Sequence, residues 1–141
     1  MAMTIQEAIG GELFRIEIKE KYPLEHETLV NQAKEEQNEE VRPELATHIE
    51  NVEQYDIIFL GYPNWWGDMP QPLYTFLEEY DFSGKTIIPF NSHGGSGFSN
   101  TIEEIKKLQP NATVKDDGLS ISRNDVADSE QEITDWAKGF Q

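Results

Sequence analysis

With 141 residues, 37% of them hydrophobic and 11% aromatic, the chain is long enough to fold as one domain around a sizeable core. Asp and Glu number 27 against 11 Lys and Arg, and the resulting net charge of −16 disfavours nucleic acid and anionic lipid as partners and favours basic proteins. The absence of cysteine excludes disulfides, thiolate metal sites and cysteine nucleophiles. Since no run of about 18 apolar residues and no basic-then-apolar start occurs, we expect a soluble, cytoplasmic protein without a membrane span or signal peptide.

The first 19 residues predict a helix followed by a strand. The apolar residues at helical spacing are Met1, Ile5, Ala8 and Ile9. Gly10-Gly11 supplies a stop for this helix. Residues 13–18 alternate apolar and charged side chains, which is typical of a strand near a sheet edge with one face in water.

A charged stretch then leads to a second predicted helix. Residues 20–44 contain few apolar side chains, so we expect a long connection with room for one short helix. Pro43 suits a first helical turn, and Leu45, Ile49 and Val52 follow at the spacing of one helical face.

A short buried strand precedes an aromatic loop. Residues 57–60 are consecutively apolar, too few for a helix, and therefore suit a parallel strand covered on both faces. Gly61 is expected to end this strand. Trp65 and Trp66 then stand where a surface loop should be polar.

The next stretch predicts a helix, a second buried strand and a second loop. Pro70 and Pro72 begin a helix whose apolar face carries Leu73, Phe76, Leu77 and Tyr80. Residues 86–90 predict a second buried strand, and residues 91–98 a glycine-rich loop. A helix capped by Asn100 follows.

The last third predicts one more strand and helix. Residues 112–121 can form a strand interrupted around residues 116–118, and Asp125 begins a final helix whose Trp136 is expected in the core. Strands and helices therefore alternate along the chain. This order predicts an α/β fold, with a parallel sheet covered by helices on both faces.

The two loops after Leu60 and Phe90 carry the groups that a flat ligand needs. Ligands of α/β sheets bind beyond the carboxyl ends of the strands. An indole of Trp65 or Trp66 can stack on a planar ring, and the main-chain N–H groups of residues 94–97 can point at the ring's polar edge. Two structural alternatives remain open: one tryptophan plugs the core, and the glycine cluster is only a tight turn.

A hydrolase and a metal site fit the sequence less well. A G-x-S-x-G motif around Ser96 would require glycine where Phe98 stands, and His93 is too close in sequence to serve as a triad partner. The three histidines, His26, His48 and His93, show no spacing typical of metal ligands.

Several motifs together resemble the small flavodoxin-like flavoproteins. They are Arg42-Pro43, Tyr55-Asp56, Gly61-Tyr62-Pro63-Asn64-Trp65-Trp66, Tyr80-Asp81-Phe82-Ser83-Gly84-Lys85-Thr86, and Pro89-Phe90 followed by Gly94-Gly95-Ser96-Gly97. The resemblance covers residues 11–121 and implies a single flavodoxin-like domain, a three-layer, doubly wound parallel sheet that holds the isoalloxazine ring of FMN between the two loops. The cofactor-binding residues that it implies are Pro63, Asn64, Trp65, Trp66, Gly67, Ser92, His93, Gly94, Gly95, Ser96 and Gly97.

The chain departs from this family at its start. Flavodoxin-like proteins begin with a strand and a phosphate-binding loop, whereas this chain begins within the first helix, so it is expected to be N-terminally truncated relative to the family. The missing first strand would lie in the centre of the sheet, between residues 13–18 and 57–60. We expect upstream sequence, direct pairing of these two strands, or a homodimer. Loss of about three hydrogen bonds to the phosphate, at ~1.5 kcal/mol each, would weaken FMN binding about a thousandfold.

The resemblance leads to three hypotheses for function. The first is an FMN-binding electron-transfer protein that serves redox partner proteins or a small electron acceptor. The second is an NAD(P)H-dependent quinone or flavin reductase on the same fold, which needs room above the flavin. The third is a remnant that has lost its cofactor. In the two flavin hypotheses the flavin is the redox centre and no side chain acts as acid, base or nucleophile.

Overall fold

A parallel sheet forms the centre of the protein, in a computed structural model that describes residues 1–19, 26–39, 41–49, 52–95 and 97–140. Within these residues the strands are β1 (Ile57–Pro63), β2 (Thr86–His93), β3 (Thr113–Val114) and β4 (Leu119–Ser122). β2 lies between β1 on one side and β3 and β4 on the other, and every pair is parallel. The predicted α/β class is therefore confirmed.

β3 and β4 are two parts of one interrupted strand. β3 pairs with β2 at Ile87↔Val114, and β4 resumes the pairing at Phe90↔Leu119. The interruption lies beside Pro89, which has no backbone N–H to contribute to a ladder. Gly118 passes so close that a Cβ there would lie 2.3 Å from the Pro89 carbonyl oxygen. The predicted break around residues 116–118 thus has a physical cause in the neighbouring strand.

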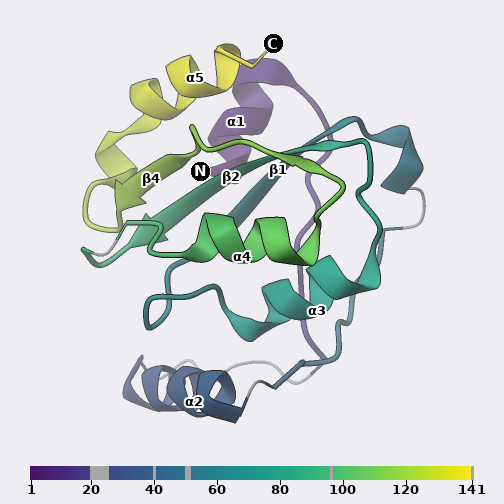
Figure 1. Ribbon diagram of the computed structural model, residues 1–141. Helices are drawn as coiled ribbons and strands as arrows, with labels where there is room; N and C mark the ends of the chain where they lie inside the picture. Colours follow the sequence, from purple (N-terminus) through teal and green to yellow (C-terminus); the bar gives the residue numbers. More distant parts are fainter. Residues whose placement is uncertain (20–25, 40, 50–51, 96, 141) are drawn as a thin grey trace.

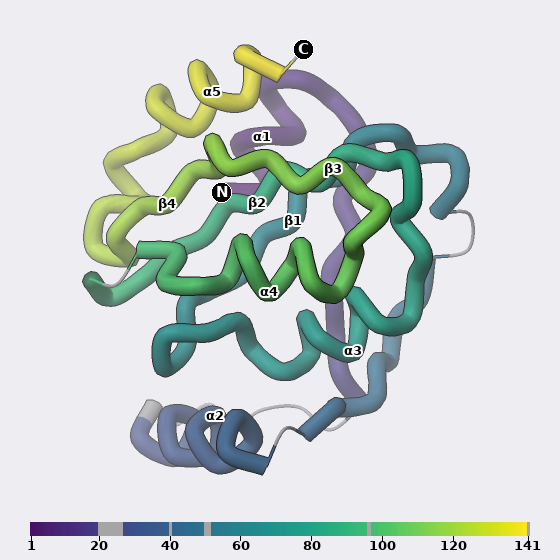
Figure 2. The backbone as a smooth tube through the Cα atoms, in the orientation of Figure 1, coloured from purple at the N-terminus to yellow at the C-terminus, as the bar shows by residue number. Residues whose placement is uncertain are grey.

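Helices cover both faces of the sheet (Figure 1). They are α1 (Ala2–Ile9), α2 (His26–Glu39), α3 (Gln71–Glu79), α4 (Thr101–Leu108) and α5 (Glu130–Lys138), with short 3-10 turns at Val52–Gln54 and Val126–Asp128. α1 and α5 pack together on one face, and α3 and α4 cover the other. α2 lies beyond α3, on the side away from the sheet (Figure 2). The chain that follows α1 runs past the sheet toward the side of the molecule where α2 lies. No helix within the described residues is long and apolar enough to span a membrane.

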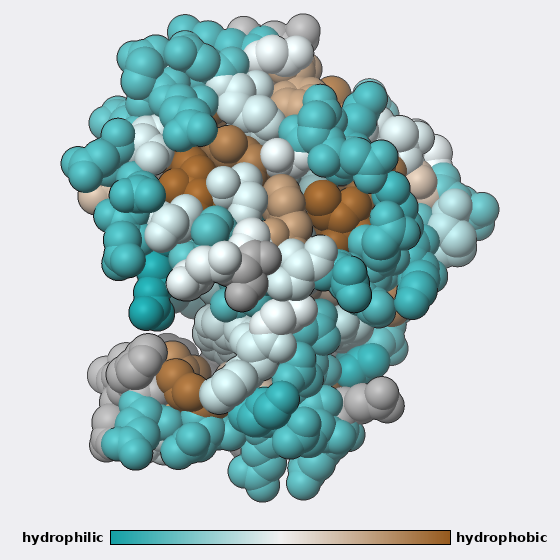
Figure 3. Space-filling model, turned by 60° about the vertical axis from the view of Figure 1, so that its left-hand side comes forward, coloured by the Kyte–Doolittle hydropathy of each residue, from teal (hydrophilic) through white to brown (hydrophobic). Residues whose placement is uncertain are grey.

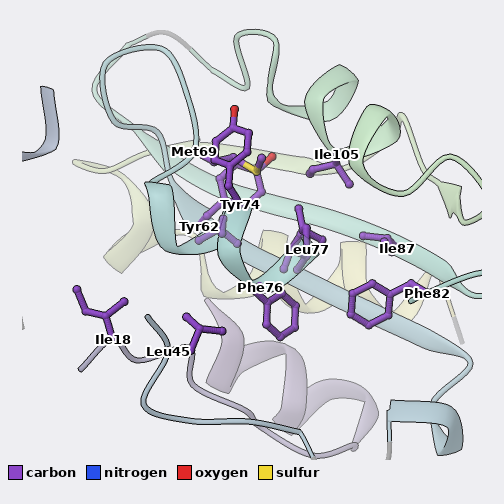
Figure 4. Packing of buried hydrophobic residues seen from close by; sticks show 12 residues of the cluster. Ile18, Leu45, Tyr62, Met69, Tyr74, Phe76, Leu77, Phe82, Ile87 and Ile105 are labelled. Atoms are coloured by element: carbon purple, nitrogen blue, oxygen red, sulfur yellow. The ribbon is translucent and has the colours of Figure 1, made fainter. Parts of the chain in front are cut away.

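The sheet separates two hydrophobic clusters. The larger one lies under α3 and α4, where Phe76, Leu77 and Phe82 are at most 3% exposed (Figure 4). The smaller one lies under α1 and α5 and comprises Ile5, Phe90, Ile121, Ile133 and Ala137. Trp136, expected in the core, is packed against this second cluster, with its ring edge-on to Phe59. Each face of the sheet is thus closed by apolar side chains at the helical spacings seen in the sequence.

Two predictions for the N-terminal third are wrong. Residues 13–18 form no strand of the sheet, and Ile18 makes only an isolated antiparallel bridge to Leu45. The helix predicted from Pro43 does not form, and residues 43–49 have no regular structure apart from an isolated bridge at Leu45 and a bend at Ala46. Thr47 Oγ1 donates to Arg15 O and accepts from Glu17 N, and Leu45 is 1% exposed. Burial of Leu45 against the core and these tertiary hydrogen bonds outweigh the local helical spacing.

The charged connection contains more helix than predicted. α2 has 14 residues, although only Ala33 among its described side chains is buried. Its Glu, Gln, Lys and Ala content favours helix through intrinsic propensity and not through an apolar face. No described strand other than β2 pairs with β1, so the predicted direct pairing of residues 13–18 with 57–60 does not occur.

Both central strands extend further than predicted. Gly61 does not end β1 but lies within it, opposite Phe90 of β2. A Cβ at position 61 would lie 2.3 Å from the Phe90 ring, so the glycine makes room for that side chain. Pro63, Ser92 and His93, expected in loops, are the last residues of their strands.

Candidate functional site

The two predicted loops meet at the carboxyl end of the sheet. Pro63 of β1 lies opposite Ser92 of β2, and Asn64 N donates to Ser92 O at 2.8 Å. Because neighbouring parallel strands end side by side, the loops that leave them begin in contact. Ten of the eleven predicted residues are thus placed around one edge of the sheet, while Ser96 lies outside the described residues.

The aromatic loop is a tight turn closed at both ends. Trp65 N donates to Asp68 O at 2.8 Å, and Asp68 N donates back to Trp65 O at 3.1 Å. Trp66 has φ 55° and Gly67 has φ 74°, the pair of positive angles typical of a type I′ turn. A positive φ is costly for a bulky residue and persists only where the surroundings enforce it. The turn therefore holds Trp66 in a backbone conformation that it would not adopt alone.

Helix α2 binds the tip of this turn. Trp66 Nε1 donates to Val30 O at 2.9 Å, and Gln37 Nε2 donates to Trp66 O at 3.2 Å. Lys34 Nζ lies 5.3 Å from the centre of the indole, within the range of a cation–π interaction. The Trp66 side chain is still half exposed, whereas Trp65 is partly buried. Neither tryptophan plugs the core, and Trp66 connects the turn to α2.

The surface is hollowed near α2. In the space-filling view, a recess separates the lower lobe that contains α2 from the main body (Figure 3). A polar pocket of about 300 Å³ also lies between the turn, α3 and α4, and it is lined by Gln37, Arg42, Asp68, Gln71, Tyr74 and Glu104. This lining carries charges and amides, so it suits a flat apolar ring poorly.

The glycine loop is fixed by two asparagines. Gly97 O accepts hydrogen bonds from Asn64 Nδ2 at 2.8 Å and from Asn91 Nδ2 at 3.0 Å. Asn91 is 1% exposed, and its Oδ1 accepts from Ser120 Oγ at 2.6 Å. Sequence analysis missed Asn91 and Ser120, although an asparagine directly after a buried strand was a usable signal. The loop is therefore preorganised by the buried amide of Asn91 on β2, which Ser120 of β4 holds in place, and by the Asn64 amide after β1.

Asn64 makes hydrogen bonds to both loops. Its Oδ1 accepts from Gly67 N at 3.0 Å, while its Nδ2 donates to Gly97 O and, at 3.0 Å, to Ser99 Oγ. The amide thus joins the aromatic turn to the glycine loop. It positions the residues that border the site, and its own hydrogen-bonding groups are occupied by protein.

His93 and the first glycines shape the open side of the loop. His93 Nδ1 accepts from Gly95 N at 2.9 Å, so the neutral ring carries its proton on Nε2. Gly95 has φ 139°, a conformation open to glycine alone, and a Cβ there would meet no atom within 4 Å. Space beside the main chain is therefore available to a ligand. A Cβ on Gly94 would lie 3.9 Å from the Arg123 guanidinium.

Two tyrosines border the site without being suited to acid–base chemistry. Burial raises the pKa of Tyr62 to about 12, and its hydroxyl lies 2.8 Å from Thr101 Oγ1. Burial and the hydrogen bond to the Asp68 carboxylate, at 2.6 Å, also raise the pKa of Tyr74. Both phenols stay protonated near neutral pH. The described residues contain no group of three or more His, Asp or Glu that could hold a metal ion.

Taken together, the site is an edge of the sheet that is bordered by an aromatic turn and a main-chain loop. The groups that border it fit a planar ring, because an indole is exposed on one side and glycine backbone on the other. Neither an activated nucleophile nor an acid–base pair is formed by the described residues at this edge.

Known proteins match this chain along almost its whole length. A profile of the flavodoxin family matches residues 1–139. A protein from Bacteroides eggerthii assigned as a flavoprotein is 30% identical, with a TM-score of 0.79 over 97% of this chain and 86% of that one. A similar protein from Bacteroides uniformis is 28% identical, with a TM-score of 0.81 over 97% and 87%.

A more distant match shares the fold. It is a flavoprotein from Lactobacillus acidophilus solved in complex with FMN, 20% identical, with a TM-score of 0.67 over 90% of this chain and 86% of that one. Among proteins with curated descriptions, none matches.

Proposed function

Since the chain belongs to the flavodoxin family, we propose that it is an FMN-binding electron-transfer protein whose flavin ring lies between the Trp65–Asp68 turn and the glycine loop, residues 94–97. FMN, when bound, supplies the redox chemistry. The chain's own residues bind the ring, orient it and limit its contact with water.

The observation that carries this proposal is the connection of the two loops through Asn64. Its amide holds the turn and the glycine loop at once, so the two loops are fixed relative to each other before any ligand enters. A preorganised site reduces the entropy lost on binding. The FMN complex of the Lactobacillus acidophilus flavoprotein further supports flavin as the ligand.

Trp65 and Trp66 would contribute the stacking face. One side of the Trp66 indole is taken by Lys34, and the half-exposed remainder can lie against a ring. On the other side of the site, backbone of the glycine loop would border the polar edge of the ring.

The surface charge indicates the kind of redox partner. A net charge of −16 would steer basic proteins toward this chain and repel acidic ones. Electron transfer with a basic partner protein should therefore slow as salt concentration rises, because screening shortens the reach of these charges.

Flavin binding can be tested by fluorescence titration of the purified protein with FMN. We expect bound FMN with quenched fluorescence, and a Kd that rises about three- to tenfold in Trp66→Ala, since an aromatic contact contributes roughly 0.5–1.5 kcal/mol. Trp66→Phe retains a ring but loses the hydrogen bond to Val30 O, so it separates stacking from the connection to α2.

Trp136→Phe is the matched control, because Trp136 lies on α5 and packs against the smaller hydrophobic cluster, not at the site. A protein that leaves FMN fluorescence unchanged at all concentrations would refute flavin binding. Unchanged affinity in both Trp65→Ala and Trp66→Ala would refute the placement of the ring against this turn.

A further inference from the structure

Arg123 stands at the open end of the glycine loop. It follows β4 directly, and its N–H donates to His93 O at 2.7 Å, which extends the pairing of β4 with β2 by one residue. Its guanidinium reaches over Gly94, where a Cβ would lie 3.9 Å from both Cζ and Nε. Only glycine at position 94 leaves this space empty, so a ligand along the loop would meet the guanidinium.

The charge of Arg123 is not neutralised by another described side chain. The ion pairs among described residues use other cations, namely Arg15, Lys19, Arg42, His48, Lys106 and Lys107. The side chain is exposed. In a chain with 27 acidic residues, an arginine without such a partner at the edge of a ligand site is available to an anion.

The main chain of the loop makes this cation more significant. Gly95 N–H already donates to His93 Nδ1, so it cannot also serve a ligand. Because this backbone donor is occupied, a side chain must provide more of the stabilisation of negative charge at the ring's polar edge. Arg123 is the described cation in contact with this loop.

We propose that Arg123 stabilises the negative charge that the flavin ring acquires on reduction, and so raises the reduction potential of the bound flavin; this inference rests on the proposed function. Two electrons from a reduced basic partner protein and one proton from water convert the neutral oxidised ring into a reduced ring with one negative charge. The guanidinium interacts more strongly with that charged ring than with the neutral one, and it gives up no proton itself.

The potential and the binding affinities of Arg123→Gln test this proposal. We expect the Kd of oxidised FMN to change less than about threefold, and the affinity for the reduced form to fall about tenfold. For a two-electron couple, a tenfold difference lowers the midpoint potential by ~30 mV. Arg123→Lys keeps the charge but not the planar guanidinium group, so its midpoint potential should fall by less.

Two controls make the outcome specific. Riboflavin has no phosphate, so the drop in potential should be the same with riboflavin as with FMN. Arg15→Gln removes a positive charge that pairs with Glu17 outside the site, and it should leave the potential unchanged.

Three results would overturn the proposal. One is an unchanged potential in Arg123→Gln, and another is an equal drop in Arg15→Gln, which would show an effect of net charge alone. The third is a loss of affinity for oxidised FMN but not for riboflavin, which would assign Arg123 to the phosphate. Wild-type protein that binds no flavin would instead refute the proposed function, and this inference with it.

Discussion

Replacing Asn64 tests whether one amide holds the aromatic turn and the glycine loop together at the proposed flavin site. In Asn64→Ala, the hydrogen bonds to Gly97 O, Ser99 Oγ and Gly67 N are lost together. Each contributes about 0.5–1.5 kcal/mol, and the low end applies to the two that are exposed, so the sum is about 2 kcal/mol. This free energy orders the two loops and not the core. Because these bonds exist only in the folded protein, the free energy of unfolding should fall by up to about 2 kcal/mol.

FMN binding should weaken as well, because the ligand must then order the loops that Asn64 no longer holds. A loss of about 2 kcal/mol corresponds to a ~30-fold weaker Kd, since each 1.4 kcal/mol is a factor of ten. Asn91 still holds Gly97 O in the variant, which reduces the expected change to about tenfold. Fluorescence titration measures the Kd, and amide exchange at Gly67 measures loop order without any flavin.

Two further variants sharpen the result. Asn64→Asp keeps an oxygen to accept from Gly67 N but loses both donors to the glycine loop, so only that loop should become disordered. Asn100→Ala is the control, because this asparagine precedes α4 without a side-chain cap hydrogen bond. If Asn64→Ala left both the Kd and the exchange at Gly67 unchanged, the amide would not be what holds the loops.

Three further predictions concern the fold that supports the site. Gly61→Ala should destabilise the protein by about 1–3 kcal/mol in urea unfolding, because its Cβ would overlap the Phe90 ring. Gly94→Ala is the control and should not destabilise it, since the atoms nearest to its Cβ would lie at 3.9 Å. Equal urea midpoints for the two variants would contradict the packing argument. Thr75→Val should stabilise by about 1 kcal/mol, because Thr75 Oγ1 is buried without a hydrogen-bond partner among the described residues, and a loss of stability would mean that the hydroxyl is satisfied. Burial raises the pKa of Tyr62 from 10 to about 12, so its neutral form contributes about 2–3 kcal/mol that is fully present below pH 10 and is lost as pH rises to about 12. Tyr62→Phe should therefore lose less stability over that range, and parallel pH profiles would refute the assignment.

Within the described residues, the sequence identified the elements that are built on local patterns. Buried strands of consecutive apolar residues appear as β1 and β2, and the apolar faces of α3, α4 and α5 follow from helical spacing. The break in the last strand was readable at residues 116–118, although its cause, contact of Gly118 with the Pro89 carbonyl, was not. Local spacing succeeds here because each element buries the side chains that its own period brings to one face.

The N-terminal third shows where such patterns fail. Leu45 and Ile49 have the spacing of a helix, yet Leu45 lies in an irregular segment bridged to Ile18. The hydrogen bonds of this bridge run from Lys19 N to Glu44 O and from Ala46 N to Glu17 O, between residues 25 and 29 positions apart, and a window of ten residues contains no trace of that pairing. Helix α2, in contrast, has no apolar face and forms because its residues have a high intrinsic helix propensity.

The candidate site divides in the same way. Sequence determined which two strand ends carry aromatic and glycine residues, because both loops lie next to strongly apolar strands. Only the tertiary structure decided that Asn64 and Asn91 share the Gly97 carbonyl, that Trp66 is bound to α2, and that Arg123 reaches Gly94. These contacts join segments 6 to 36 residues apart, and their geometry exists only once the parallel strands have placed their carboxyl ends at a common edge.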